Sequence, residues 1–242
     1  MDRRRVAASA ALVGAGAYLL VEVLSVVFVT GFSTVASEKL ALVGGASLAY
    51  LVGAGGVYFG YVGVLDRPWN YAQLRVPDFE DVVWTVAGFA AMFGVMFVVS
   101  LVAQFVLDVE PAQHGLIQNV EDDPSFALYL LPLVALVVAP LEELVYRGLV
   151  QTRLREAFDP WSAVGLSSVL FALIHVAAYS TMSESVLQTS VPLALIFGVA
   201  MVMGGLYERT GNLFVPIALH SAFNGLQMVV LYLDAVYDLG AT

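Results

Sequence analysis

Three short polar patterns lie within long apolar stretches of the chain, and their residue types could do chemistry together. They are Glu142-Glu143-x-x-x-Arg147, Phe171-x-x-x-His175 and His220-x-x-x-Asn224. An ionisable side chain at membrane depth costs about 2.5–3.5 kcal/mol on insertion scales. Two glutamates, one arginine and two histidines at that depth are therefore expected to meet and to act together.

The chemistry that fits these residue types is the hydrolysis of an amide bond. A glutamate beside a histidine in a mostly apolar cavity, here Glu142 and His175, could activate a water molecule as a general base. His220 and Asn224 could donate hydrogen bonds to the oxyanion that develops on a carbonyl. The chain has no Gly-x-Ser-x-Gly and no His-Glu-x-x-His pattern, which are typical of a serine nucleophile and of a zinc protease.

The first two patterns are expected at one depth, on the two arms of an antiparallel helical hairpin. Amphipathic character continues past Arg147 and breaks at Asp159-Pro160, because proline cannot donate a backbone hydrogen bond and disfavours helix in the preceding residue. Glu142 lies 17 residues before Asp159, and His175 lies 16 residues after it. At 1.5 Å per residue, both lie roughly 25 Å from the turn.

The third pattern arrives through another turn, formed by the polar stretch 207–212. Pro216 follows, and proline is tolerated in a first helical turn. Residues four apart share a helix face, so His220 and Asn224 point together into the bundle, and Glu143 and Arg147 are spaced for an ion pair. Glu142 lies about 100° around the helix from Glu143, because each residue turns a helix by that angle. The two carboxylates are therefore expected to have separate tasks.

The composition is that of a polytopic membrane protein. Of the 242 residues, 60% are hydrophobic and 12% are charged, whereas a soluble domain has about 45–50% apolar and about 25% charged residues. The absence of cysteine excludes disulfides, thiolate metal sites and cysteine nucleophiles. The formal net charge of -10, with a single lysine, suits a high-salt prokaryote and argues against nucleic acid as a partner.

We expect an all-α bundle of about seven membrane spans, since a span needs about 20 apolar residues. The chain then divides into a three-span region at 1–124, a motif-bearing core at 125–233 and a tail at 234–242. The spans lie at roughly 7–31, 40–64, 82–107, 125–149, 161–180, 188–207 and 213–233.

The basic residues predict the orientation of the bundle. Nine of the ten Lys and Arg residues fall on one side of the expected spans, and Lys39 alone falls on the other. The positive-inside rule makes the first side cytoplasmic. The N-terminus is then cytoplasmic and, with seven spans, the C-terminus lies outside. The opposite loop, 108–124, is acidic, and its His114 is expected to be solvated.

The three patterns resemble those of the CPBP family of intramembrane proteases, the CAAX-processing and bacteriocin-processing group also called the Abi family. That family has Glu-Glu-x-x-x-Arg, Phe-x-x-x-His and His-x-x-x-Asn or Asp on successive core helices, and this chain has all three in order. Its Tyr146-Arg147-Gly148 ending and the approach Arg209-Thr210-Gly211-Asn212 to Pro216 are also similar. The resemblance covers about residues 125–233, and the family's better-known members usually have eight spans.

The resemblance implies a role for each matching position. Glu142 would activate water with help from His175, and His220 and Asn224 would form the oxyanion hole. Glu143, Arg147 and Phe171 would orient and shape the site. The family implies a glutamate protease without a catalytic metal, acting near the cytoplasmic face on a membrane-associated or lipidated protein, as in the removal of the last three residues of a prenylated CAAX tail.

Two alternatives remain open from the residues alone. Glu142, His175 and His220 would make an acceptable three-ligand zinc site, so a zinc-dependent version of the same protease is one of them. The other is a non-enzymatic membrane protein, such as an immunity factor, a scaffold or a transporter, because polar groups at mid-membrane also mark ion and proton paths.

Overall fold

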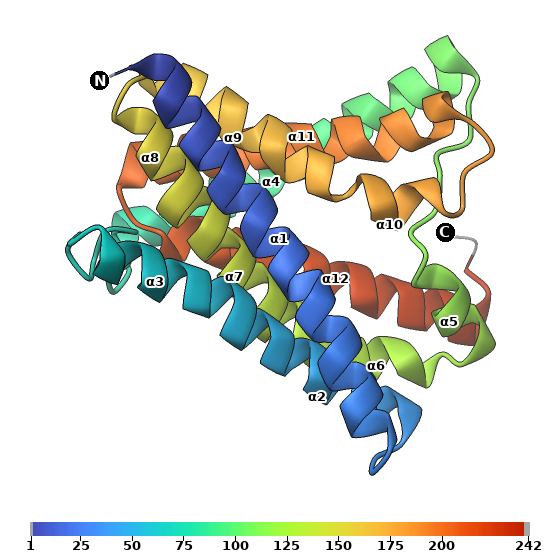
Figure 1. Ribbon diagram of the computed structural model, residues 1–242. Coiled ribbons are helices and arrows are strands. Elements are labelled where there is room, and N and C mark those ends of the chain that lie inside the picture. Colours follow the sequence, from blue (N-terminus) through green and yellow to red (C-terminus); the bar gives the residue numbers. More distant parts are fainter. Residues whose placement is uncertain (1, 240–242) are drawn as a thin grey trace.

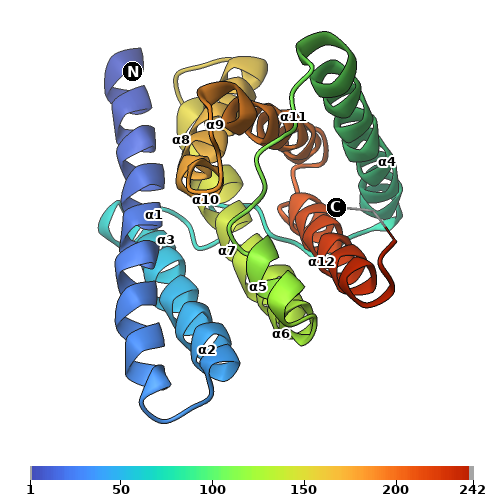
Figure 2. The same cartoon turned by 90° about the vertical axis from the view of Figure 1, so that its right-hand side faces the viewer.

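The computed structural model describes residues 2–239, and within that range the chain is helical without a strand. This confirms the all-α membrane bundle predicted from the sequence. The first long helix, drawn in blue, slopes across the front of the view, and the helix Val186–Thr210 (α11, orange) runs at a large angle to it (Figure 1). The hairpin of the first two long helices lies on one side and α4 on the other, and the motif-bearing helices lie between them (Figure 2).

The N-terminal hairpin consists of two long helices, of which α1 is the first. Helix α1 spans Arg3–Ser33. The second helix is continuous from Glu38 to Val64 and comprises α2 (Glu38–Tyr50), the π-helical turn η1 (Leu51–Gly55) and α3 (Gly56–Val64). A Cβ at Gly53 would lie 2.8 Å from a methyl carbon of Val21, so glycine is required for this close approach of the two helices.

Helix α4 forms the opposite flank of the bundle. It spans Phe79–Val102 and continues as the π-helical turn η2 (Ala103–Leu107). Asp78 and Asp81 form a capping box at its start, in which each side chain accepts the backbone N–H of the other. The loop 108–116 then crosses past the helices Val176–Ser180 (α10) and Val186–Thr210 (α11) to the short helix α5, Ile117–Asp122 (Figures 1 and 2).

The first motif lies on a single long helix, continuous from Ser125 to Arg155. The helix continues past Arg147, as predicted. It contains two prolines, and π-helical segments begin two residues after Pro132 and four residues after Pro140. Such segments are frequent at functional sites. Its parts are α6 (Ser125–Leu133), η3 (Val134–Val138), α7 (Ala139–Glu143), η4 (Leu144–Gln151) and α8 (Thr152–Arg155).

The second and third motifs lie on the helices that follow. Asp159 caps α9 (Pro160–Ile174) by accepting the backbone N–H of Ser162, which confirms the predicted break. The chain bends at His175 into α10 (Val176–Ser180). Helix α11 spans Val186–Thr210 and ends at Gly211, whose φ of 58° favours glycine, and α12 spans Phe214–Tyr237.

Within residues 2–239, six helices are long and apolar enough to cross a membrane, so the predicted count of seven, or eight, is not confirmed. The difference lies in the expected span 161–180. There α9 has 15 residues and stops before His175, which is short for a bilayer crossing. The long helices are Arg3–Ser33, Glu38–Val64, Phe79–Leu107, Ser125–Arg155, Val186–Thr210 and Phe214–Tyr237.

Ion pairs join neighbouring elements at each end of the bundle. Arg67 contacts Glu156 at 2.9 Å, and Arg155 at the end of α8 contacts Glu208 in α11 at 3.1 Å. Lys39 pairs with Asp123, which joins the first hairpin turn to the acidic loop. The lone lysine and the acidic loop therefore share one end of the bundle, as the sequence predicted.

Candidate active site

The motif side chains lie between α7, η4, α9 and α12, in the middle of the bundle. Glu142 and Glu143 end α7, and Arg147 lies in η4. Phe171 is on α9, and His220 and Asn224 are on α12. The largest apolar core cluster of the described residues surrounds them, with members on α1, α4, α9, α11 and α12. Tertiary packing therefore brings the three patterns together, although 49 residues separate Phe171 from His220 in the sequence.

Glu143, Arg147 and His220 form a buried network. A guanidinium nitrogen of Arg147 lies 2.7 Å from Glu143 Oε1, and His220 Nδ1 lies 2.9 Å from the same oxygen. Arg147 also donates to the backbone carbonyl of Ala200 at 3.2 Å. Glu143 is 0% exposed and Arg147 is 1% exposed. The predicted ion pair is therefore confirmed, and it includes the histidine of the third motif.

The hydrogen bond between Glu143 and His220 indicates which ring nitrogen of His220 carries a proton. A carboxylate paired with arginine can only accept, so Nδ1 of His220 must be the donor. In the neutral ring, Nε2 then carries a lone pair and faces Glu142, whose Oε2 lies 3.9 Å away. His220 thus lies between the two glutamates of the first motif.

The ring of Phe171 packs against four side chains of the site. The Arg147 guanidinium lies over it, 4.7 Å from its centroid, in a cation–π contact. The ring centroids of Tyr146, His175 and His220 lie 5.1, 4.8 and 5.8 Å away. Phe171 therefore holds the first and third motifs at a fixed distance from the second.

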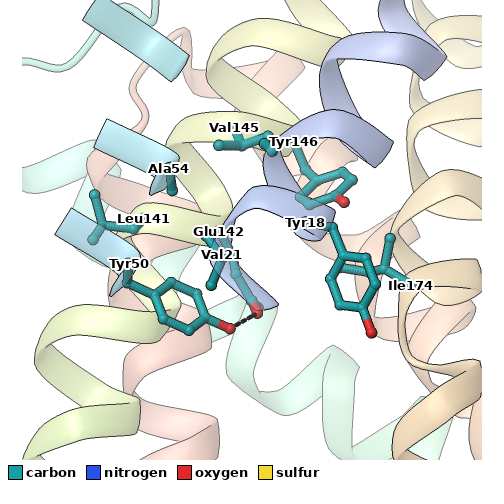
Figure 3. A pocket seen from close by; sticks show the side chains of 10 residues that line it. Tyr18, Val21, Tyr50, Ala54, Leu141, Glu142, Val145, Tyr146 and Ile174 are labelled. Carbon is teal, nitrogen blue, oxygen red and sulfur yellow. Dashed lines mark hydrogen bonds between the residues drawn. The ribbon is translucent and has the colours of Figure 1, made fainter. Parts of the chain in front are cut away.

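Glu142 faces a different environment from Glu143. Its Oε1 accepts a hydrogen bond from the hydroxyl of Tyr50 at 3.1 Å, and its side chain lines a small pocket of about 20 Å³ (Figure 3). The pocket lies between α1, α2, α7 and α9, and its other lining residues are Ala17, Tyr18, Val21, Ala54, Leu141, Val145, Tyr146 and Ile174. The two consecutive carboxylates therefore have different partners, as their 100° separation predicted.

His175 and Asn224 lie at the edge of the cluster. His175 Nδ1 lies 2.8 Å from the carbonyl oxygen of Phe171, so Nδ1–H donates and Nε2 remains available. Ile174, the preceding residue, lines the Glu142 pocket, which supports a shared depth. Within residues 2–239, neither the His175 ring nor the Asn224 amide makes a hydrogen bond to Glu142.

Two residues near the site were not recognised correctly from the sequence. Tyr50 was missed because the chain has 11 tyrosines and no spacing links this one to Glu142. His114 was expected to be solvated, and that expectation is wrong. It is half-buried, packs edge-on against Tyr179 at 5.2 Å, and accepts the backbone N–H of Leu116. Burial, followed by the charge of His175, lowers the pKa of His114 below its ordinary value.

A three-ligand zinc arrangement is not formed by these side chains. Among the described residues, no three His, Asp or Glu side chains converge as metal ligands. Glu142 and His220 approach each other, but each already has another partner, Tyr50 for Glu142 and Glu143 for His220. The residues in this arrangement therefore do not fit the metal site that their types allowed.

Fold and site together define a polytopic α-helical membrane protein with an acid–base cluster inside the bundle. Comparison with protein families matches residues 124–226 to the family described as "Type II CAAX prenyl endopeptidase Rce1-like". That segment of the chain is therefore similar to Rce1-like sequences, which confirms the predicted resemblance to the CPBP family. It contains all seven candidate residues and less than half of the chain.

One curated protein also matches. It is the "Uncharacterized protein YpbD" of Bacillus subtilis (strain 168), with 31% identity over 87 residues. The alignment covers 36% of this chain and only 38% of that relative. No solved structure matches significantly. The helices and the matched segment together support a CAAX-protease-like membrane protein, and its reaction has to be argued from the site.

Proposed function

We propose that this protein is an intramembrane endopeptidase of the glutamate type, with Glu142 as the general base. The observation that carries this proposal is the contrast between two adjacent carboxylates. Glu143 is held by Arg147 and His220, whereas Glu142 is 8% exposed and lines a small pocket with room for about one water molecule. A buried carboxylate beside an imidazole, with open space next to it, is suited to activating water.

In the proposed reaction, a water molecule lies between the Glu142 carboxylate and Nε2 of His175. The water oxygen attacks the carbonyl carbon of the substrate while one water proton passes to Glu142. The tetrahedral intermediate then collapses, the C–N bond breaks, and the proton passes from Glu142 to the leaving nitrogen. His175 orients the water, and its hydrogen bond to the Phe171 carbonyl supports this role by leaving Nε2 free to accept.

Asn224 and His220 are the proposed oxyanion donors. The Asn224 amide is half-buried one helical turn beyond His220 and has no hydrogen-bond partner within residues 2–239, so its N–H is free to donate. His220 uses Nδ1 for Glu143. It can donate from Nε2 only when its ring carries a second proton, and the two flanking carboxylates would balance that charge.

The proposed substrate is a membrane-associated or lipidated protein that is cleaved near the cytoplasmic face. Apart from Glu142 and three tyrosines, the pocket beside Glu142 is lined by apolar side chains, which favours a substrate with apolar residues next to the cleaved bond. We place the N-terminus in the cytoplasm and the C-terminus outside, from the distribution of basic residues. No nucleic acid is expected as a partner.

The test is cleavage of quenched fluorogenic peptides, some ending in a farnesylated CAAX sequence, by detergent-purified protein. Wild type, Glu142→Ala and His175→Ala are compared, with Glu121→Ala at an exposed position of α5 as the control. Cleavage by wild type and the control alone supports the proposal, and full activity in pure Glu142→Ala would falsify it. A chelator arm separates this mechanism from a zinc-dependent one, since loss of activity that added zinc restores would require a metal.

A further inference from the structure

The N-terminal hairpin contacts the candidate active site through two hydrogen bonds from tyrosine hydroxyls. Tyr50 on α2 donates to Glu142 Oε1 at 3.1 Å, and Tyr146 in η4 donates to the carbonyl oxygen of Gly14 on α1 at 3.2 Å. Tyr50 and Gly14 both lie outside the segment that matches the Rce1-like family, 124–226. A residue outside the family match therefore donates a hydrogen bond to the candidate catalytic carboxylate.

The position of Tyr50 is fixed by close helix packing. Tyr50 is the last residue of α2, directly before the π-helical turn η1. Three residues later, Gly53 packs against Val21 so closely that a Cβ there would lie 2.8 Å from a methyl carbon of that valine. This contact fixes the height of the second helix against α1. The ring of Tyr50 then reaches across the pocket to Glu142 (Figure 3).

The hydrogen bond fixes one oxygen of Glu142 and leaves the other for chemistry. Oε1 accepts from Tyr50, and Oε2 faces His220 Nε2 at 3.9 Å. A glutamate side chain that lines an open pocket would otherwise sample several rotamers, which lowers the fraction in a productive geometry. Hydrogen bonds to charged groups are also stronger than neutral ones.

We propose that Tyr50 is a positioning residue that holds the Glu142 carboxylate in its productive orientation. This inference rests on the proposed function, because it assigns Tyr50 a task only if Glu142 acts on the substrate. It implies that the N-terminal hairpin is part of the catalytic unit. Tyr50 acts through Glu142, so its loss should reduce turnover more than substrate binding.

The test compares Tyr50→Phe with wild type in the cleavage assay. Loss of one hydrogen bond to a carboxylate predicts a kcat lower by about ten- to a hundredfold, with KM changed by less than about twofold. Tyr58→Phe is the matched control, since it removes a hydroxyl of the same long helix that donates to the Trp69 carbonyl at 3.0 Å, away from Glu142. Its kcat should equal that of wild type.

A second measurement separates positioning from a general structural role. Glu142→Asp withdraws the carboxylate from Tyr50, so Tyr50→Phe should lower kcat much less in that background than in wild type. Equal losses in both backgrounds would overturn the inference. So would full kcat in Tyr50→Phe while Glu142→Ala is inactive, an outcome that leaves the proposed function standing. A change in KM alone would likewise overturn it.

The inference also remains testable if wild type cleaves no peptide, an outcome that counts against the proposed function instead. Thermal unfolding in detergent is then measured for Tyr50→Phe, Glu142→Ala and the double variant, since alanine has no acceptor for the Tyr50 hydroxyl. Additive shifts in Tm would show that the side chains do not interact, and would overturn the inference. A double variant less destabilised than the sum of the single variants would support Tyr50 holding Glu142.

Discussion

Glu142 and Glu143 are neighbours in the sequence, yet they occupy two different halves of the site. In the closed half, Glu143 binds Arg147 and His220 through a single buried oxygen. In the open half, Glu142 binds Tyr50 and lines a pocket whose far wall is formed by α1. A rotation of about 100° along the helix separates these environments. The comparison teaches that neighbouring identical residues can divide structure and chemistry between them.

Substitutions in the two halves should affect different properties of the protein. The closed half holds a buried guanidinium, which must be paired because an isolated buried charge is very unfavourable. The open half holds a carboxylate that is stabilised by a hydrogen bond from the Tyr50 hydroxyl. We therefore expect substitutions in the open half to reduce activity, and substitutions in the closed half to reduce stability.

The largest expected effect is on activity, from Glu142→Gln. Removal of a general base lowers kcat by about 10²–10⁴-fold, whereas the amide keeps the shape of the side chain and the packing of α7. The Tm in detergent should stay within a few degrees of wild type. Cleavage rates and differential scanning fluorimetry check both parts, and a large fall in Tm would break the comparison.

Glu143→Ala should instead act on stability. The substitution leaves Arg147 buried with the Ala200 carbonyl as its remaining acceptor, and breaking a buried ion pair on one side costs about 3–5 kcal/mol. Chemical denaturation in mixed micelles measures the loss. A double variant, Glu143→Ala with Arg147→Leu, should recover part of it because no unpaired charge remains. If the double variant is no better, the ion pair is not what stabilises the closed half.

Phe171→Leu should damage both halves to a moderate degree, because the ring contacts Arg147 in one half and His175 in the other. Loss of the aromatic and cation–π contacts should cost about 1–3 kcal/mol. The kcat should also fall, since His175 loses the ring that supports it. Stability and turnover are measured on the same preparation, and a loss confined to one of them would show that the two halves are not joined through this ring.

The smallest expected effect concerns His114, which lies beside the open half. Burial lowers its pKa in the folded state, so the unfolded chain binds the proton more readily. Its contribution to stability is therefore present above the ordinary histidine value of 6.5 and is lost as the pH falls below it. Hydrogen exchange of loop 108–116 should rise as the pH is lowered, after correction for intrinsic rates. In His114→Gln that rise should be absent, and an unchanged rise would assign it to another group.

Sequence patterns predicted the local elements well where one helix decides the outcome. The Glu143–Arg147 pair, the helix that continues past Arg147, and the start of α9 at Asp159-Pro160 all follow from spacing within a helix or from the lack of a backbone N–H in proline. The span at 161–180 was harder to predict. Its apolar residues continue past His175, but the ring of that histidine bonds back to Phe171 and the helix bends there.

By itself, the sequence determined an all-helical membrane protein, the three polar patterns and the family that they resemble, because these depend on composition and on spacing along one helix. Only the tertiary structure decided which partner each polar group takes. It placed the His220 ring in hydrogen-bond contact with Glu143. It also brought Tyr50 into contact with Glu142, 92 positions away in the sequence. Such contacts depend on how closely two helices approach each other, and small residues such as Gly53 control that distance. The spacing of residues within one helix does not predict it.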